Sequence, residues 1–259
     1  MAFWARPVAL RLGRSANSPW WLTALAIIAF VGCIRPVATL GISEHLDYNE
    51  AWNVFHATVA WSGKNPYLDA GAPYFDNYPP LSFYIVGLVG HLLSSDILAG
   101  RILSLCSCAA IAIGVGGAVR SMGCTRTEAV FSAALFLASI TLFNTYVGMD
   151  DPQLLGQAVA IAGFNLIIRD PKSSRLMFFG SLLLTTALFI KHNLIAQPIA
   201  LLFWLLLFDR RAMWRFALQG LLFGMLGLAA CAMALISATA LVSTVVAWVI
   251  AAVAASTRS

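Results

Sequence analysis

The sequence contains eight apolar runs separated by polar segments, and each run is close to the length of a helix that crosses a membrane. This pattern restricts the folds that the chain can adopt. The hydrocarbon core of a bilayer is about 30 Å thick, and a helix needs about 20 apolar residues to cross it. The sequence therefore predicts an all-α polytopic membrane protein with about eight spans. The expected spans are residues 20–42, 99–119, 127–148, 152–168, 175–190, 193–208, 213–235 and 237–256.

The amino-acid composition excludes several other classes of protein. Only 10% of the 259 residues are charged and 60% are hydrophobic, whereas a soluble domain carries about 25% charged residues. These values exclude a disordered chain, a module that binds nucleic acid and a small disulfide-rich secreted domain. The five cysteines include no Cys-x-x-Cys pair, and four of them lie in the apolar runs, so we interpret them as buried thiols.

The positions of the charges predict how the chain is oriented. If residues 79–95 crossed the bilayer, only five of the 16 Lys and Arg residues would face the cytoplasm. If 79–95 lies along the outer surface instead, 12 of the 16 face the cytoplasm, as the positive-inside rule prefers. We therefore expect a cytoplasmic N-terminus over 1–19, a single transmembrane domain over 20–256 and a short C-terminal tail over 257–259.

The first outer loop, residues 43–98, is the longest polar stretch of the chain. Apolar side chains at helical spacing predict an interfacial helix at about 48–62, and 79–95 is expected to form a second one. Asp47 and Glu50 are three residues apart, so they share a face if the first helix begins near Asp47. Eight of the 11 acidic residues lie on the outer side, so this is the side on which chemistry is expected.

Other polar groups are expected on the same side. Asp150 and Asp151 stand where the fourth span begins, Lys191 lies in a tight turn between the fifth and sixth spans, and Asn77 precedes a pair of prolines. Carboxylates beside a cation suit group transfer from a lipid-phosphate donor. One carboxylate takes the proton from an acceptor hydroxyl, and the cation stabilises the charge on the departing phosphate.

Each of these groups also has a structural interpretation. The acidic residues can serve as caps at helix N-termini, and Lys191 can extend its ammonium group from an apolar stem to the headgroup region. The four histidines lack the spacing of metal ligands. The aromatic residues of the loop, Tyr78 among them, favour an interfacial belt over a sugar-binding platform.

The polar segments carry a resemblance to a known family. The motifs are LDYNEAWNVFHA after the first span, NPYLD and NYPPLSFYIVGLV later in the loop, MDDPQLLGQA at the fourth span, and FIKHNLIAQPIALLFWLLLF across the fifth and sixth. In order and spacing they resemble the GT-C superfamily of membrane glycosyltransferases. The branch they resemble is the family-39-type enzymes, related to protein O-mannosyltransferases and lipid A aminoarabinose transferases. The resemblance covers roughly residues 20–215.

The resemblance implies a GT-C-like transmembrane module with two interfacial helices in the first outer loop. It further implies a polyprenyl-phosphate-linked sugar as donor, an inverting transfer, and an active site at the periplasmic face of a bacterial inner membrane. The catalytic base would be Asp47 or Glu50, because the adjacent Asp-Glu pair of the family reads Asn49-Glu50 in this chain. The resemblance does not identify the acceptor.

The resemblance also implies a set of residues around the donor. Members of the family place a lysine near the donor phosphate, and an acidic residue before a proline at the fourth span. If the reaction uses Mg²⁺ or Mn²⁺, Asp150 and Asp151 would be its ligands. Family members generally continue beyond the point where this chain stops, and acceptor recognition usually depends on that part. The residues implied at the donor are Lys191, Asp150, Asp151, Asn77 and Tyr78.

A non-catalytic membrane protein is the alternative, either one that transports or handles lipids or an inactive truncated remnant of a glycosyltransferase. Transport requires ionisable groups at mid-membrane depth. Away from the cytoplasmic ends of the expected spans, only Arg35 and Arg101 are charged, and both lie near outer ends. The two halves of the chain also show no inverted repeat. We therefore expect a membrane glycosyltransferase.

Overall fold

The structure is a computed structural model that describes residues 20–67, 78–142 and 146–236. Within these ranges the chain is helical and contains no β-strand, as the sequence predicts. The elements, in chain order, are α1 (Trp20–Ala38), α2 (Tyr48–Trp61), α3 (Leu81–Leu93), α4 (Asp96–Ser121), α5 (Arg126–Leu142), α6 (Pro152–Arg169), α7 (Ser174–Ile190), the 3₁₀ helix η1 (His192–Ile195), α8 (Ala196–Phe208) and α9 (Arg210–Ile236).

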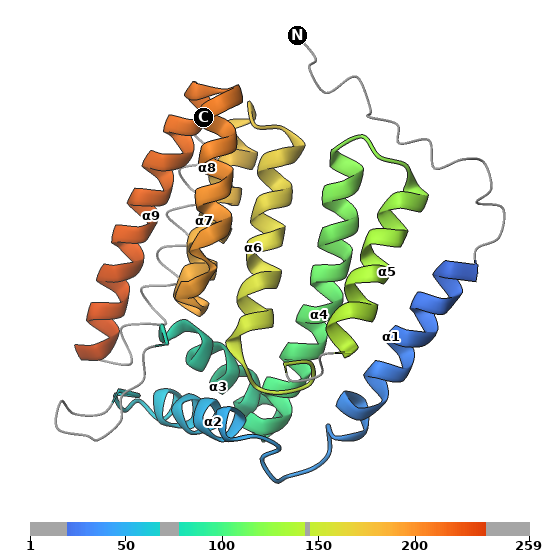
Figure 1. The fold of residues 1–259 in the computed structure, drawn as a ribbon. Helices are drawn as coiled ribbons and strands as arrows, with labels where there is room; N and C mark the ends of the chain where they lie inside the picture. The colour runs from blue at the N-terminus through green and yellow to red at the C-terminus, as the bar shows by residue number, and fades with distance from the viewer. Residues whose placement is uncertain (1–19, 68–77, 143–145, 237–259) are drawn as a thin grey trace.

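The long helices form a bundle, and α2 and α3 lie across one end of it (Figure 1). We call this the α2–α3 end. There, Asn53 of α2 donates a hydrogen bond to the backbone of Asp150. At the opposite end, Arg215 of α9 donates to the carbonyl groups of Pro171 and Lys172 between α6 and α7. The described turns that the sequence predicts on the outer side therefore gather at one end of the bundle.

Three of the described helices are long and apolar enough to cross a membrane: α1, α4 and the Arg210–Met233 part of α9. Large apolar side chains on these helices are exposed, for example Phe30 at 72% and Leu221 at 63%. Apolar surface of this extent favours contact with lipid over contact with water. The structure therefore agrees with a membrane protein, and the number of spans beyond these three stays a prediction.

The predicted helix boundaries agree with the structure where an apolar run and a helix coincide. This holds for 99–119, 152–168 and 175–190, which correspond to α4, α6 and α7. The ranges 213–235 and 193–208 correspond to α9 and, after the 3₁₀ turn η1, to α8. The segments 1–19, 237–256 and 257–259 lie outside the described residues.

Two predicted spans were too long. The run 20–42 forms a helix only to Ala38. In the run 127–148, the residues up to Leu142 are helical and the described residues 146–148 form a turn. Gly148 in that turn has a φ of +73°, which a residue with a side chain rarely adopts. A Cβ there would also lie 2.6 Å from the Cβ of Pro36. Hydropathy counts apolar residues whatever their backbone does, so it could not detect these ends.

Helices α2 and α3 occupy the ranges predicted for the two interfacial helices, 48–62 and 79–95. With 13 residues, α3 is too short to cross a bilayer at 1.5 Å per residue. Their position at a membrane interface stays a prediction. One face of α2 is buried. In its first turns this face carries the polar residues Glu50 and Asn53, and in its later turns it carries the small apolar residues Ala57 and Ala60.

That buried face packs against α3 and the beginning of α4. The two short helices approach closely, because a Cβ on Gly87 of α3 would lie 2.9 Å from the carbonyl oxygen of Ala57. The cluster between the three helices comprises Ala57, Ala60, Phe83, Val86 and Ala99. The first turn of α2, with Glu50, is thereby pressed against α4.

Candidate functional site

Asp47 caps the N-terminus of α2. Its backbone is extended, with φ −150° and ψ 155°, and its Oδ1 accepts a hydrogen bond of 2.8 Å from the Asn49 N–H. This is the usual role of an acidic residue before a helix, because the first N–H groups have no partner within the helix. The side chain is only partly buried, so its carboxylate stays accessible.

A cavity of about 210 Å³ lies beside Asp47. Its walls come from the end of α1, from the segment that leads into α2 and from the turn before α6. Among the described residues that line it, Asp47 is the one carboxylate and Arg35 is the one cation. The lining comprises Arg35, Pro36, Thr39, Leu46, Asp47, Val147, Gly148 and Met149.

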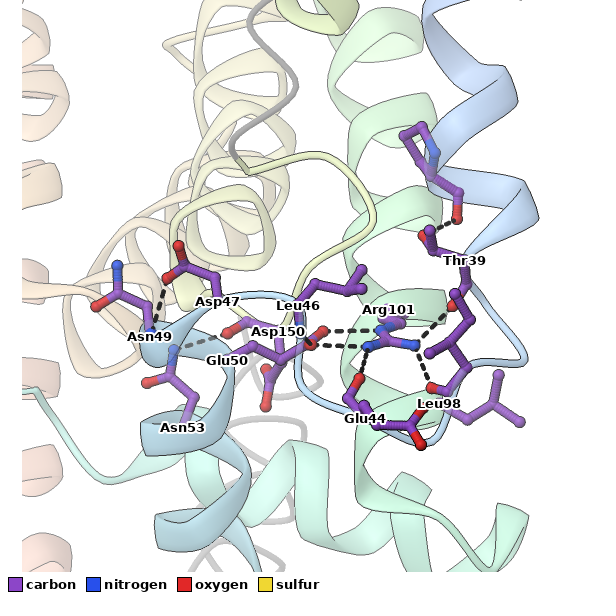
Figure 2. A network of polar contacts seen from close by, with 12 residues as sticks. Thr39, Glu44, Leu46, Asp47, Asn49, Glu50, Asn53, Leu98, Arg101 and Asp150 are labelled. Carbon is purple, nitrogen blue, oxygen red and sulfur yellow. Dashed lines mark hydrogen bonds and ion pairs between the residues drawn. The ribbon is translucent and has the colours of Figure 1, made fainter.

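Glu50, the other predicted base, lies in a different environment. Its side chain and that of Arg101 are both fully buried, and they form a two-point ion pair. Arg101 donates from Nε to Oε1 and from Nη2 to Oε2, each at 2.8 Å. Oε2 also accepts from the Leu46 N–H at 2.8 Å. Figure 2 shows the pair between α2 and α4.

The other donors of Arg101 bind the segment between α1 and α2. Nη1 donates to the carbonyl oxygens of Thr39 and Ile42, each at 2.6 Å, and Nη2 donates to that of Glu44 at 2.9 Å. A guanidinium has five N–H donors, and together with the two bonds to Glu50 all five are used. One buried side chain of α4 thus binds three carbonyl groups and one carboxylate (Figure 2).

The ion pair keeps Glu50 charged. Burial by itself raises the pKa of its carboxyl group, but the hydrogen bonds from Arg101 and from the Leu46 N–H outweigh burial and lower the pKa to below 4.5. Both oxygens are engaged, and the side chain has no exposed surface. A substrate hydroxyl cannot reach this carboxylate in the conformation observed. Of the two carboxylates that the sequence offers, Asp47 is the one that faces a cavity.

Asp150 is buried as well, with 3% of its surface exposed. Its carbonyl oxygen accepts a 2.7 Å hydrogen bond from the Asn53 side chain, but its Oδ2 has no partner among the described residues. Burial, followed by the negative charges of Glu50, Asp151 and Asp96, holds the pKa of the carboxyl group well above 3.8. A carboxyl group in this setting retains its proton more readily than an exposed one.

Asp150 should therefore make the protein less stable as the pH rises. The folded state holds a proton that the unfolded state releases, so this contribution is fully present below the unfolded pKa of about 3.9 and is lost as the pH rises through the folded pKa. In Asp150→Asn we expect this part of the pH dependence to disappear. Thermal unfolding of both proteins in detergent over a pH series tests it, and parallel curves would contradict it.

Gly100 of α4 leaves room for Asp150. A Cβ at this position would lie 2.4 Å from both Cβ and Cγ of Asp150, so we expect Gly100→Ala to destabilise the protein by about 1–3 kcal/mol. Gly117→Ala in the same helix is the control, because its Cβ would meet Asn165 Oδ1 at an ordinary 3.6 Å and alanine favours the helix. Equal unfolding midpoints of the two variants would rule out the proposed clash.

Asp151 and Lys191 meet at the same end of the bundle. Asp151 caps α6, with its Oδ1 accepting from the Gln153 N–H at 2.7 Å, and Lys191 follows α7. Lys191 Nζ lies 3.7 Å from Asp151 Oδ1 and 3.6 Å from the centroid of the Tyr78 ring. The lysine is thus held by a carboxylate and an aromatic face. The structure brings these three predicted residues together, whereas Asn77 lies outside the described residues.

Asp150 and Asp151 contact different neighbours. Asp150 packs on Gly100, and Asp151 faces the Lys191 ammonium group. In the described part of the chain, no three His, Cys, Asp or Glu residues are grouped so that they could hold a metal ion. Binding of Mg²⁺ or Mn²⁺ by Asp150 and Asp151 stays a prediction.

A groove of about 470 Å³ lies between α7, α8 and α9. Its lining is almost wholly apolar and includes Leu188, Ile195, Leu202, Leu221 and Leu228. Ile195 belongs to η1, which directly follows Lys191. Lys191 does not line the groove itself, but Leu188 and Ile195, which do, lie three residues before it and four residues after it in the chain.

Sequence reasoning missed the role of Arg101. It placed Arg101 near the outer end of a span and gave it no partner. The available signal was the charge itself, since a guanidinium in an apolar run needs a buried carboxylate or several carbonyl groups around it. Asn53 carried no such signal, because an amide on a helix has many possible partners. Arg35 reaches the cavity because α1 ends beside it.

Comparisons with known proteins were made in three ways, against models of protein families, against curated proteins and against solved structures. None of the three gives a match to this chain. The function is accordingly inferred from the residues and the geometry described above.

Proposed function

We propose that this chain is a membrane glycosyltransferase module that uses a polyprenyl-phosphate-linked sugar as donor. One observation carries the proposal: a carboxylate on a cavity wall, Asp47, and a buried lysine, Lys191, lie at the same end of an apolar bundle. A series of contacts connects α2 to Lys191: Asn53 of α2 bonds to Asp150, and the next residue, Asp151, pairs with Lys191. The motif order noted in the sequence supports the same function.

In the proposed reaction, Asp47 acts as the general base. It takes the proton from the acceptor hydroxyl while that oxygen attacks the anomeric carbon of the donor sugar. The bond from this carbon to the lipid phosphate breaks at the same time, so the configuration is inverted. Lys191 stabilises the negative charge that the phosphate gains as it leaves. Glu50 takes no part in the proton transfer, because its carboxylate is occupied by Arg101.

The surroundings of Lys191 support a lipid donor. Its side chain is buried beside Asp151 and Tyr78, which places a positive charge where a phosphate is shielded from bulk water. The apolar groove that Ile195 lines offers a surface for an isoprenoid chain. A buried cation and an apolar groove that are both built around the end of α7 suit a polyprenyl phosphate better than a nucleotide sugar. The periplasmic location of this end, the eight spans and the interfacial position of α2 and α3 belong to the same proposal.

Donor turnover tests the function. The purified chain in nanodiscs is given radiolabelled polyprenyl-phosphate sugars, and released sugar and free lipid phosphate are counted. We expect Lys191→Met to raise the KM for the donor at least about tenfold, because truncating one partner of a buried charge contact costs about 2–5 kcal/mol. Lys64→Met is the control, since Lys64 is an exposed lysine just after α2.

Other outcomes would point to the alternatives. Saturable donor binding that depends on Lys191, without turnover, would favour a protein that handles lipids. The absence of both binding and turnover would favour an inactive remnant and contradict the proposed function.

A further inference from the structure

We infer that Arg101 is a positioning residue for Asp47. Its guanidinium, together with Glu50, fixes the segment 39–50 that forms one wall of the cavity, and so decides where the Asp47 carboxylate stands. The inference rests on the proposed function in one respect, that Asp47 is the base. It adds a role for two residues that contact neither the donor nor the acceptor.

The contacts of Arg101 reach the cavity wall directly. Thr39 lines the cavity, and its carbonyl oxygen accepts from Arg101. Leu46 also lines the cavity, and its N–H donates to the same Glu50 oxygen that Arg101 Nη2 binds. Asp47 is the residue after Leu46. One end of the segment is therefore fastened to the guanidinium directly, and the other end, beside Asp47, is fastened to it through the Glu50 carboxylate.

The segment has few other bonds of its own. After α1, backbone hydrogen bonds join the Leu40 N–H to Val37 and the Ile42 N–H to Thr39, both at 3.2 Å. The carbonyl groups of Ile42 and Glu44 bond to Arg101. Because one side chain binds three carbonyl groups of this loop, it contributes strongly to the shape of the loop.

The chemistry of the residue is specific to arginine. A guanidinium presents five donors in a rigid plane, so it can bind a carboxylate at two points and still reach three carbonyl groups. A lysine ammonium has three donors at one point and cannot span the same set. We therefore expect Arg101→Lys to keep the buried charge pair and to lose the shape of the segment.

The positioning role can be separated from stability. A buried ion pair can be replaced by apolar residues with little loss of stability, provided that both charges are removed together. Such a pair cannot donate to the carbonyl groups of Thr39, Ile42 and Glu44. In Glu50→Met/Arg101→Met the protein should therefore fold, while the segment loses its attachment.

Two readouts test this. In a background without the five native cysteines, Glu44→Cys carries a spin label, because the Glu44 side chain is exposed and only its backbone binds Arg101. We expect an immobilised label in the parent and a mobile one in the double variant and in Arg101→Lys. The mobility of a label at Lys172→Cys, at the opposite end of the bundle, should not change.

The second readout is kinetic. In the unlabelled double variant and in unlabelled Arg101→Lys we expect kcat to fall about 100-fold relative to the parent, with the donor KM within about threefold of the parental value.

The outcomes are distinguishable. An immobile label with parental kcat in both the double variant and Arg101→Lys would overturn the inference and leave the pair a purely structural one. A mobile label with undiminished kcat would overturn it too. If the double variant does not fold, Arg101→Lys decides alone. If the labels respond as expected while the parent itself transfers no sugar, the proposed function fails and the fixing of segment 39–50 by Arg101 stands.

Discussion

Asp47→Asn is expected to lower kcat for sugar transfer by about 10²–10⁴-fold, the range for loss of a general base, without unfolding the protein. Asparagine is as good an N-cap as aspartate, so the bond from the Asn49 N–H to the side chain can be kept while the basic carboxylate is lost. The substitution therefore separates the chemistry of Asp47 from its structural role. The measurement is single-turnover transfer from a radiolabelled donor, with the unfolding midpoint taken in parallel.

Asp170→Asn is the matched control for this prediction. Asp170 is exposed at the opposite end of the bundle, and its Oδ1 accepts from an N–H two residues further on, as Asp47 does. It should keep full activity. Full activity of Asp47→Asn, together with loss of activity in a well-folded Glu50→Gln, would assign the base to Glu50 and contradict the role proposed for Asp47.

Arg101→Met should be among the most destabilising single changes in the protein. It leaves the Glu50 carboxylate buried without its partner, and breaking a buried pair in this way costs about 3–5 kcal/mol. Glu50→Met/Arg101→Met should recover most of that loss, because no unpaired charge stays behind. Unfolding of the wild type and of the single and double variants in mixed detergent gives the free energies of a double-mutant cycle.

The pH adds a second check on the same pair. In the wild type the folded pKa of Glu50 lies below 4.5, so the stabilisation is fully present above the unfolded pKa and is lost as the pH falls through the folded one. In Arg101→Met the carboxyl group is buried without its partner and binds a proton more readily. The difference in the free energy of unfolding between Arg101→Met and the wild type should therefore become smaller as the pH falls. Equal free energies of unfolding for Arg101→Met and the wild type at neutral pH would show that the pair contributes no net stability.

Helix positions are the part of the fold that follows most directly from the sequence. The ranges of α4, α6 and α7 agree with the predicted spans to within three residues, because an apolar run and the helix that it forms have the same cause, the burial of apolar side chains along a hydrogen-bonded backbone. The predicted spans 20–42 and 127–148 included the turns at 39–41 and around Gly148, because apolar residues in a turn have the same hydropathy as those in a helix.

The sequence by itself determined that this chain is helical and apolar, and it selected polar residues that the structure places at the α2–α3 end. Asp47, Glu50, Asp151 and Lys191 were all candidates from their types and spacing alone. Their separate roles were decided by the tertiary structure. Asp47 and Glu50 are similar acids three residues apart, and nothing local distinguishes them. The packing of α4 against α2 brings Arg101 to Glu50, 51 residues away, and leaves Asp47 on the cavity. A side chain's charge is a property of the residue, whereas its partner depends on which helices pack together.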